Sequence, residues 1–477
     1  MARPAVLLLA AAFVALTGTR AEGDESCGIE YGPSRLGNFS HWAVSTPARQ
    51  CAPVARKEGQ ALSLISREVA PTAARRDMFV GNATLSLKGF LGTPYSKTPY
   101  AWHATGFPVS KLIAYSLCYE ARDLFSCPDG PCDPTWEPFW NRKAKRPLIA
   151  GERLVQKDLA KTLAEIAKHG PNYFYEGKLA EQMVQEIAKH GGAIYSYIMA
   201  IMDAFRSNDS AALQDDVLTL HRFVEACKFA YAKRALLGDP RFVNVADLVQ
   251  NLTSRDNAES TRRQIDDERT YHDPAHYGFV GQIMPSSKGT AHLAMWKDGD
   301  ALSVTSSINS YFGSHVRSSS GIVFNNHMDD FSIPGESNYW GVAPSKANFI
   351  EPGKRPQSSM SPSIVLDPNG DVELVVGGSG GPKITTGAAL VSMRSLWMGS
   401  NIKDAIDYAR VHDQLIPDYI MAEPAFPEMY SLLLKAKGHN IQTVATEEFS
   451  NVQGVLRKSG RLYANSDYRS GGDVYGG

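Results

Sequence analysis

The sequence changes in character at Gly289, and this change restricts the folds open to the chain more than any other feature. From Thr290 onward, β-favouring residues predict two strands, over 290–296 and 301–311, joined by a tight turn that contains a glycine. Strand signals dominate from there to the C-terminus. The second half of the chain is therefore predicted to supply a β-sheet.

A glycine-rich stretch farther along has a predicted strand before it and a predicted helix after it. The strand covers 372–376, the glycines fall within 377–381, and the helix covers 386–398. The first half has a helical pattern over 152–236, including an amphipathic helix at 221–237. These elements together predict an α/β protein with its sheet in the second half.

The polar stretch that separates the two halves contains few apolar residues and is punctuated by proline. It spans 253–287, and we expect a long exposed connection there.

Composition limits the partners of the chain. Its 477 residues are 43% hydrophobic and 21% charged, which is typical of a globular protein with one large domain or two to three smaller ones. The formal net charge is -1, so no overall field attracts the protein to nucleic acid or to an anionic membrane. Any partner must be recognised by a specific site.

The N-terminus resembles an export signal. Arg3 precedes an apolar run over 5–17, and small residues near Ala21 could be cleaved. The run is shorter than the roughly 20 residues that span a bilayer, so we expect a secreted protein that loses residues 1–21, with a short uncleaved membrane anchor as the alternative. Four N-x-S/T sequons, at Asn38, Asn82, Asn208 and Asn251, are candidates for glycosylation.

All six cysteines lie before residue 228, which suits an oxidising compartment. Cys127 and Cys132 flank a turn-forming Pro-Asp-Gly-Pro stretch, and we predict a local disulfide between them. Zinc binding is the alternative, but no second closely spaced pair of cysteines or histidines accompanies this one.

Two local features could carry chemistry. Thr290 follows a glycine where an exposed connection meets a strand, so cleavage before it would free both a hydroxyl group and an α-amine. Such an amine, with a reference pKa of about 7.7, could take the hydroxyl proton without a distant histidine. Gly380 and Gly381 could present backbone N–H groups to an oxyanion. By spacing alone, an ordinary strand start and an ordinary turn are the favoured interpretations of these two features.

Several long motifs in one fixed order resolve this ambiguity, because together the second half resembles the small subunit of γ-glutamyltransferases, also called γ-glutamyl transpeptidases or glutathione hydrolases. The matching motifs are Gly289–His292, Thr305–Gly313, Phe324–Asp330, Pro352–Met360, Gly380–Gly381 and Val411–Leu415. In the first half, Arg67–Pro71 resembles a further family motif.

The resemblance implies roles for individual residues. It makes Thr290 the self-processing residue and nucleophile, and Gly380 and Gly381 the donors to the oxyanion. The substrate-binding residues that it implies are Ser307 beside the nucleophile, Asn309 and Asp330 for the α-amino group, His327 beside them, and Arg67, Ser358 and Ser359 for the α-carboxylate. A charged amine binds well to a carboxylate and a carboxylate to hydroxyl and cationic donors, so these residue types suit their tasks.

Two departures separate the chain from the family pattern. His327 stands where the family usually has glutamate, so we expect weakened or altered recognition of the γ-glutamyl amine. Between Cys51 and Arg67 there is no room for a helix and a glycine turn that normally form core, and the large-subunit region is shortened at two further places.

The resemblance implies an αββα sandwich of the N-terminal-nucleophile type, cut into a large fragment over 22–289 and a small one over 290–477. The implied substrates are glutathione and other γ-glutamyl compounds, with water, amino acids or dipeptides as acceptors, and neither a metal nor an organic cofactor. A secreted γ-glutamyltransferase-like binding or interaction protein without catalysis is the first alternative. An asparaginase-like threonine hydrolase is the second, although it accounts for none of the motifs after residue 305.

Overall fold

The structure is a computed structural model that describes residues 34–46, 107–157, 192–279 and 289–477, with short gaps inside the last three ranges. The chain divides into two compact units. One contains residues 1–30 and 107–154, and the other contains residues 31–106 and 155–477. The predicted signal segment over 1–21, Arg67 and the predicted disulfide between Cys127 and Cys132 lie outside the described residues.

The described part of the first unit is built from short elements. Strands β3 (Phe107–Pro108) and β6 (Arg153–Leu154) pair, as do β4 (Trp140–Asn141) and β5 (Arg146–Pro147), and the helices are α6 (Ala121–Leu124) and η3 (Pro134–Phe139). Leu154 lies in a strand, so the helical pattern predicted from residue 152 is wrong at its start. Trp136 is buried against Phe139, and Cys118 is disulfide-bonded.

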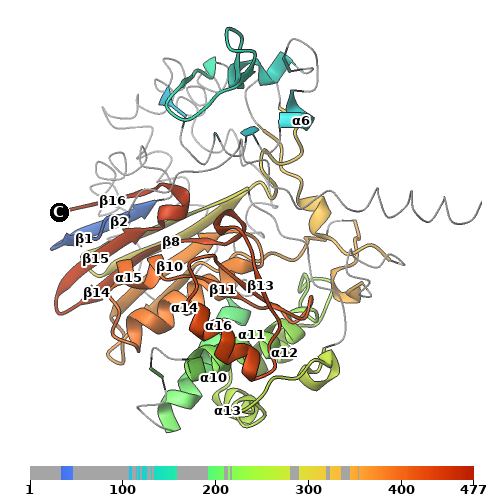
Figure 1. The fold of residues 1–477 in the computed structure, drawn as a ribbon, viewed down its shortest axis with the longest axis vertical. Coiled ribbons are helices and arrows are strands. Elements are labelled where there is room, and N and C mark those ends of the chain that lie inside the picture. Colours follow the sequence, from blue (N-terminus) through green and yellow to red (C-terminus); the bar gives the residue numbers. More distant parts are fainter. Residues whose placement is uncertain are drawn as a thin grey trace, which may run out of the picture. The chain divides into compact units, whose positions relative to one another are not determined.

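Two antiparallel sheets form the centre of the second unit (Figure 1). The larger sheet has five strands, in the order β1 (Gly37–Phe39), β15 (Arg461–Ser466), β14 (Asn451–Lys458), β10 (Val372–Ser379) and β9 (Ser363–Leu366). The smaller has four, in the order β16 (Asp473–Gly476), β2 (Trp42–Thr46), β7 (Thr290–Lys297) and β8 (Asp300–Ser307). A separate small sheet contains β11 (Val411–His412), β12 (Ile420–Ala422) and β13 (Ile441–Thr443).

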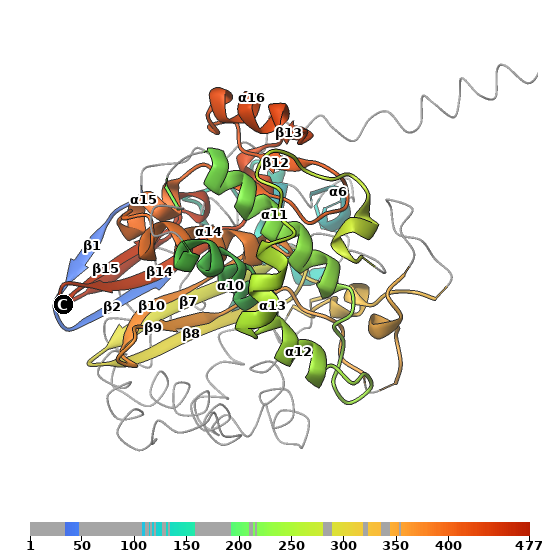
Figure 2. The same ribbon diagram turned by 90° about the horizontal axis from the view of Figure 1, so that it is seen from below.

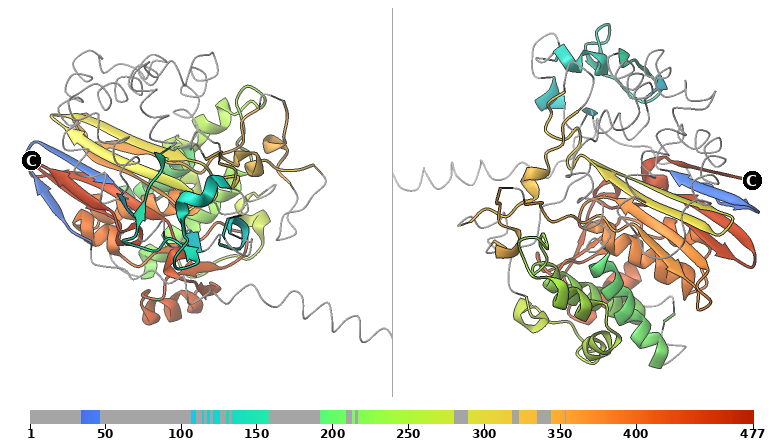
Figure 3. Two further views of the ribbon diagram at one scale, coloured as in Figure 1. Left: turned by 90° about the horizontal axis from the view of Figure 1, so that it is seen from above. Right: turned by 180° about the vertical axis from the view of Figure 1, so that it is seen from behind.

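The two large sheets pack face to face (Figure 3). Alternate residues of each strand point into the space between them, as the period of two along a strand requires. Ala294 of β7 and Val375 of β10 are fully buried there, and the imidazole of His292 lies directly over Gly377. A side chain at position 377 would put its Cβ 2.4 Å from that ring, so only glycine fits.

Helices cover the outer face of the five-stranded sheet (Figure 2). They are α10 (Ala193–Asn208), α11 (Val217–Arg234), α14 (Lys383–Leu396) and α15 (Ile402–Asp407), with α12 (Ala246–Leu252), α13 (Arg255–Arg262) and α16 (Glu428–Ala436) around them. The described residues of this unit also form short 3-10 turns, namely η4 (Pro274–Tyr277), η5 (His327–Asp330), η6 (Lys346–Asn348), η7 (Thr446–Glu448) and η8 (Tyr468–Ser470). Leu374 and Val376 of β10 face these helices and are buried against them.

The stretch predicted to be one long exposed connection contains a regular helix, α13. Ser254 caps its start, because the hydroxyl accepts a hydrogen bond from the Asn257 amide at 3.1 Å. Its few small residues suffice for packing: Thr261 lies 2.5 Å from the Tyr197 hydroxyl of α10. The prediction was wrong here because the residues that α13 buries, Ala258 and Thr261, are too small to form the apolar stripe that indicates a helix in a sequence.

Buried imidazoles give the fold a pH dependence. Burial lowers the pKa of both His292 and His412 to about 3. The pKa of a histidine in the unfolded chain is about 6.5. Below that value only the unfolded state binds these protons, so stability is lost as pH falls, by up to about 1.4 kcal/mol per pH unit for each imidazole. The contribution of Asp413 to the pH dependence of stability has the opposite sign. Burial raises its pKa to about 7, so between about pH 4 and 7 only the folded state binds its proton and stability increases as pH falls.

Urea unfolding at pH 6.5, 5.5 and 4.5 checks this prediction. His412→Gln, which can retain the contact to Thr386 Oγ1, is expected to reduce the pH slope by about one proton. An unchanged slope in that variant would contradict the account. The exposed His272, whose side chain is 53% exposed, supplies the control substitution His272→Gln.

No helix in the described parts of the chain has the length and apolar character needed to cross a membrane.

Candidate active site

Thr290 is the first residue of β7 and faces the space between the sheets. It pairs with Ser307 of β8, and the two hydroxyl oxygens are 2.9 Å apart. The hairpin that joins these strands turns at Asp298 and Gly299, both with positive φ, as tight two-residue hairpins require. The structure therefore confirms the predicted hairpin and brings Thr290 and Ser307 together at its open end.

The peptide before Thr290 is fixed on both sides. Gly289 donates its N–H to the Asn309 carbonyl at 2.5 Å, and its own carbonyl accepts the Ile308 N–H at 3.0 Å. A Cβ atom at position 289 would lie 1.9 Å from the Ser310 carbonyl oxygen. Only glycine fits at this position, so close backbone packing determines the residue before Thr290.

Gly380 and Gly381 form the turn between β10 and α14. Both have positive φ, 124° and 61°, a conformation that L side chains rarely adopt. Two contacts between the sheets show how β7 and β10 are aligned. Ala294 lies in the same inter-sheet cluster as Val375, and His292, two residues earlier on β7, contacts Gly377, two residues later on β10. Thr290 and this turn are thereby brought to the same edge of the sandwich, near the N-terminus of α14.

Asn309 and His327 lie next to the hairpin. Asn309 has a φ of 74° and is 3% exposed, and its Oδ1 has no hydrogen-bond partner among the described residues. The left-handed conformation is tolerated by asparagine better than by most residues, and it ends β8. His327 of η5 lies 2.9 Å from Asp330 Oδ2 through Nδ1 and 3.3 Å from the Ser307 carbonyl through Nε2.

Electrostatics around η5 favour a charged imidazole. The hydrogen bond to Asp330 is the largest effect and raises the pKa of His327, outweighing the opposite effect of burial. Asp330 is itself 8% exposed, and its backbone carbonyl accepts a bond from Asn348 Nδ2 at 2.7 Å.

Ser358 and Ser359 border a separate hollow of about 110 Å³ that is also lined by Arg234, Asp239 and Thr385. Arg234 donates to Ser359 Oγ at 2.8 Å. None of the lining residues is Thr290, Gly380 or Gly381, so the hollow does not include these three residues.

Two residues of α11 contact the site, and the sequence analysis missed both. Tyr231 donates its hydroxyl to the Pro382 carbonyl, directly after the glycine turn, and Arg234 holds Ser359. Both side chains are buried, although one is polar and the other charged. A cation on the buried face of a helix is the one signal that could have indicated them.

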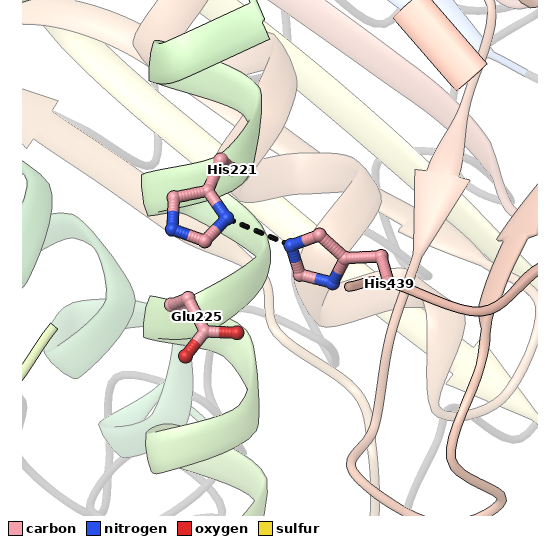
Figure 4. A group of neighbouring side chains, drawn as sticks. All are labelled: His221, Glu225 and His439. Carbon is pink, nitrogen blue, oxygen red and sulfur yellow. Dashed lines mark hydrogen bonds between the residues drawn. The ribbon is translucent and has the colours of Figure 1, made fainter. Parts of the chain in front are cut away.

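A buried group of His221, Glu225 and His439 has the residue types of a metal site, with ligand atoms within 4.8 Å of one another (Figure 4). Most of its polar atoms bind one another or their neighbours, while His439 Nδ1 has no hydrogen-bond partner among the described residues. His221 Nδ1 is 2.7 Å from His439 Nε2, and Glu225 accepts bonds from Thr270 and Tyr277. The Lys228 ammonium also lies 3.4 Å from Glu225, so the arrangement is that of a hydrogen-bonded core network.

Comparison with known proteins adds a second line of evidence. The family model of gamma-glutamyltranspeptidase matches residues 98–197 and 192–477. The chain belongs to the gamma-glutamyltranspeptidase family. It is 37% identical over 476 residues to scoloptoxin SSD14 from Scolopendra dehaani, with 86% of this chain and 81% of that protein covered. It is 34% identical over 490 residues to a glutathione hydrolase proenzyme from Escherichia coli, with 88% and 82% covered.

The fold agrees with this membership. The cephalosporin acylase from Bacillus halodurans superposes with a TM-score of 0.65 at 18% identity, covering 96% of this chain and 99% of the acylase. This gamma-glutamyltranspeptidase family member thus has the αββα sandwich of N-terminal-nucleophile hydrolases, as predicted, and belongs to an enzyme class, the γ-glutamyltransferases.

Tyr231 is expected to position the glycine turn of this gamma-glutamyltranspeptidase family member. We predict that Tyr231→Phe lowers kcat roughly three- to tenfold and changes KM less than about twofold, because one hydrogen bond that orients the turn is lost. Steady-state kinetics check this. Tyr195→Phe is a matched control, since it removes a buried hydroxyl contact to Ser392 at 2.8 Å far from the turn. Equal kcat values in both variants would contradict the positioning role.

Proposed function

We propose that the protein is a secreted γ-glutamyltransferase and glutathione hydrolase that forms its acyl-enzyme on Thr290. The observation that carries the proposal is the position of the Thr290 hydroxyl, 2.9 Å from Ser307 Oγ and next to a peptide bond held on both sides. The match of the family model to residues 98–197 and 192–477 and the shared fold support the same assignment.

Self-cleavage is the first step of this proposal. Thr290 Oγ attacks the Gly289 carbonyl carbon, the C–N bond breaks, and an ester and a free α-amine form; water then hydrolyses the ester. The Ile308 N–H, at 3.0 Å, and Ser307 Oγ, at 3.5 Å, point at the carbonyl oxygen that becomes negative. Donors aimed at a developing oxyanion are the main source of stabilisation in such acyl transfers.

Acyl transfer then uses the new N-terminus. The α-amine of Thr290, with a reference pKa of about 7.7, accepts the hydroxyl proton as Oγ attacks the γ-carbonyl of the substrate. Backbone N–H groups of Gly380 and Gly381 stabilise the oxyanion, and the proton passes to the leaving amine, which for glutathione is cysteinylglycine. Water, an amino acid or a dipeptide then takes the γ-glutamyl group. Asn309, Asp330, Ser358 and Ser359 are proposed to hold the glutamyl end, with Arg67.

Export is supported by the N-terminal apolar run and by two surface features. Asn38 and Asn251, each the first residue of a sequon, are exposed, and Cys118 is disulfide-bonded. We therefore propose cleavage of the signal near Ala21 and an extracellular location.

A non-catalytic binding protein is the second candidate, favoured by the contact between His327 and Asp330, which compensates an acidic group of the substrate site. Incubation of the purified full chain distinguishes the two. The enzyme is expected to yield a fragment that starts with Thr290-Ala291-His292 and to release chromophore from a γ-glutamyl anilide. A chain that stays intact on a denaturing gel and releases no chromophore would overturn the enzymatic proposal.

A further inference from the structure

His327 is placed between two hydrogen-bond acceptors. Nδ1 lies 2.9 Å from Asp330 Oδ2, and Nε2 lies 3.3 Å from the Ser307 carbonyl oxygen. A neutral imidazole has one N–H and can donate to only one of them, whereas an imidazolium donates to both. The geometry on both sides of the ring therefore fits the cationic form.

This cation faces the only acid among the site residues of the sandwich. Of Thr290, Ser307, Asn309, His327, Asp330, Ser358, Ser359, Gly380 and Gly381, Asp330 alone is an acid. Its carboxylate side chain is 11% exposed and that of His327 is 32% exposed, so the pair is partly shielded from water. The pair has no net charge, and Arg234 of α11 adds a further positive charge within electrostatic range of Asp330.

We propose that His327 is a specificity-determining residue that compensates Asp330 and so lets the acyl site accept, beside γ-glutamyl compounds, donors that carry a terminal carboxylate but no free α-ammonium group, such as glutaryl compounds. The inference rests on the proposed function, because it concerns the acyl donor that Thr290 attacks. Glutarate and glutamate have the same carbon chain and the same two carboxylates. They differ only in the α-ammonium, which makes them a matched pair of ligands.

The physical argument compares what each ligand meets. An ammonium must leave water, and it needs an uncompensated anion to offset that loss. Beside the His327 and Asp330 pair it finds a neutral arrangement with the imidazolium close by. Its remaining acceptor is the uncharged Oδ1 of Asn309, which has no hydrogen-bond partner in the part of the chain that the structure describes. A glutaryl donor has no ammonium group, so it loses no cation hydration and needs no uncompensated anion at this place. The preference for an α-ammonium is therefore expected to be small in this protein.

The compensation depends on pH in one direction. The hydrogen bond to Asp330 raises the pKa of His327, so the imidazole is charged throughout the range below its ordinary value of about 6.5. As pH rises through the raised value the imidazolium is lost, and Asp330 no longer has the compensation that His327 gives it. The other charged groups near this pair are Asp329, whose carboxylate accepts a bond from Asn326 at 2.8 Å, and Arg234 of α11. The preference for ligands with an α-ammonium is expected to increase with pH.

Calorimetric binding of glutamate and glutarate to the full, self-processed protein at pH 6 and pH 8 tests the proposal. We expect the wild type to bind the two ligands within about threefold of each other at pH 6, and His327→Glu to raise the affinity ratio in favour of glutamate at least about tenfold. In His327→Gln, which cannot become charged, the ratio is expected to be the same at both pH values. His272→Glu is the matched control, because it makes the same change at an exposed histidine 2.7 Å from Asp418.

A ratio that His327→Glu leaves unchanged, or that shifts equally in His272→Glu, would overturn the proposal. If His327→Glu does not fold, the pH profile of His327→Gln decides, and a profile like that of the wild type would refute it. The kcat/KM ratio for γ-glutamyl and glutaryl anilides gives a second readout in which the ionisation of Thr290 cancels. Absence of turnover on both anilides would contradict the proposed function, whereas the binding ratio would still decide the role of His327.

Discussion

Thr290→Ala is expected to leave the chain in one piece and to reduce turnover of a γ-glutamyl anilide by at least about 10⁴-fold. The substitution removes the hydroxyl that lies 2.9 Å from Ser307 Oγ, and with it the group that attacks Gly289 in self-cleavage. Without cleavage there is no free α-amine at residue 290 to act as the base. Nucleophile and base are therefore lost together, and no other residue of the hairpin can replace either.

A denaturing gel and steady-state kinetics measure these two losses separately. Thr290→Ser keeps the hydroxyl and should cleave, more slowly, because the methyl group that restricts the side-chain rotamer is gone. Ser306→Ala is a control for hydroxyl loss from the neighbouring strand, since Ser306 alternates with Ser307 and points to the other side of the sheet. A Thr290→Ala protein that still yields a fragment starting at residue 290 would contradict the mechanism.

The hairpin formed by β7 and β8 shows how far local sequence determines this fold. Its turn, Asp298-Gly299, and its start at Thr290 are where the sequence places them, because positive φ at a tight turn and the β-favouring residues beside it are local properties. The second strand ends at Ser307, four residues before its predicted end. Asn309 breaks it there by adopting a left-handed conformation that no local pattern specifies.

Elements that depend on distant packing were less predictable. The helix predicted over 221–237 is α11, Val217–Arg234, displaced toward the N-terminus by about one turn. Nearly the whole of its circumference is buried, including Glu225 and Lys228, so it lacks the one-sided apolar stripe that reveals helix boundaries. The ends of α11 are determined by its packing between other elements, and a local sequence pattern does not indicate that packing.

The residues of the candidate site likewise fall into those that the sequence indicated and those that it did not. Thr290, Ser307 and the turn at Gly380 were found because they belong to ordered motifs. Tyr231 and Arg234 were missed because their contacts join residues that lie 151 and 125 positions apart, to Pro382 and Ser359. The pairing of His327 with Asp330 was similarly invisible, although the departure at residue 327 was expected to matter.

A buried group of charges holds the end of the five-stranded sheet to the small sheet beside it. Asp467, after β15, accepts a bond from Arg410 at 2.8 Å and one from Arg469 at 2.9 Å. Glu423 binds Arg469 at 2.5 Å and completes a set of two acids and two guanidinium groups. All four residues are at most 4% exposed. Their charges balance, so each carboxylate is needed to compensate a cation that has left water.

Asp467→Ala is therefore expected to destabilise the protein by about 3 to 5 kcal/mol, because it leaves two buried guanidinium groups with a single carboxylate. It also removes the acceptor of the Val452 amide at 2.9 Å, on β14. Urea unfolding measures the change. Asp371→Ala is the matched control: its ion pair with Arg457 spans 3.5 Å and its side chain is 68% exposed, so its loss should cost less than about 1 kcal/mol. Similar losses in both variants would show that the buried charges contribute no more than a surface pair, and the balance argued for them would be wrong.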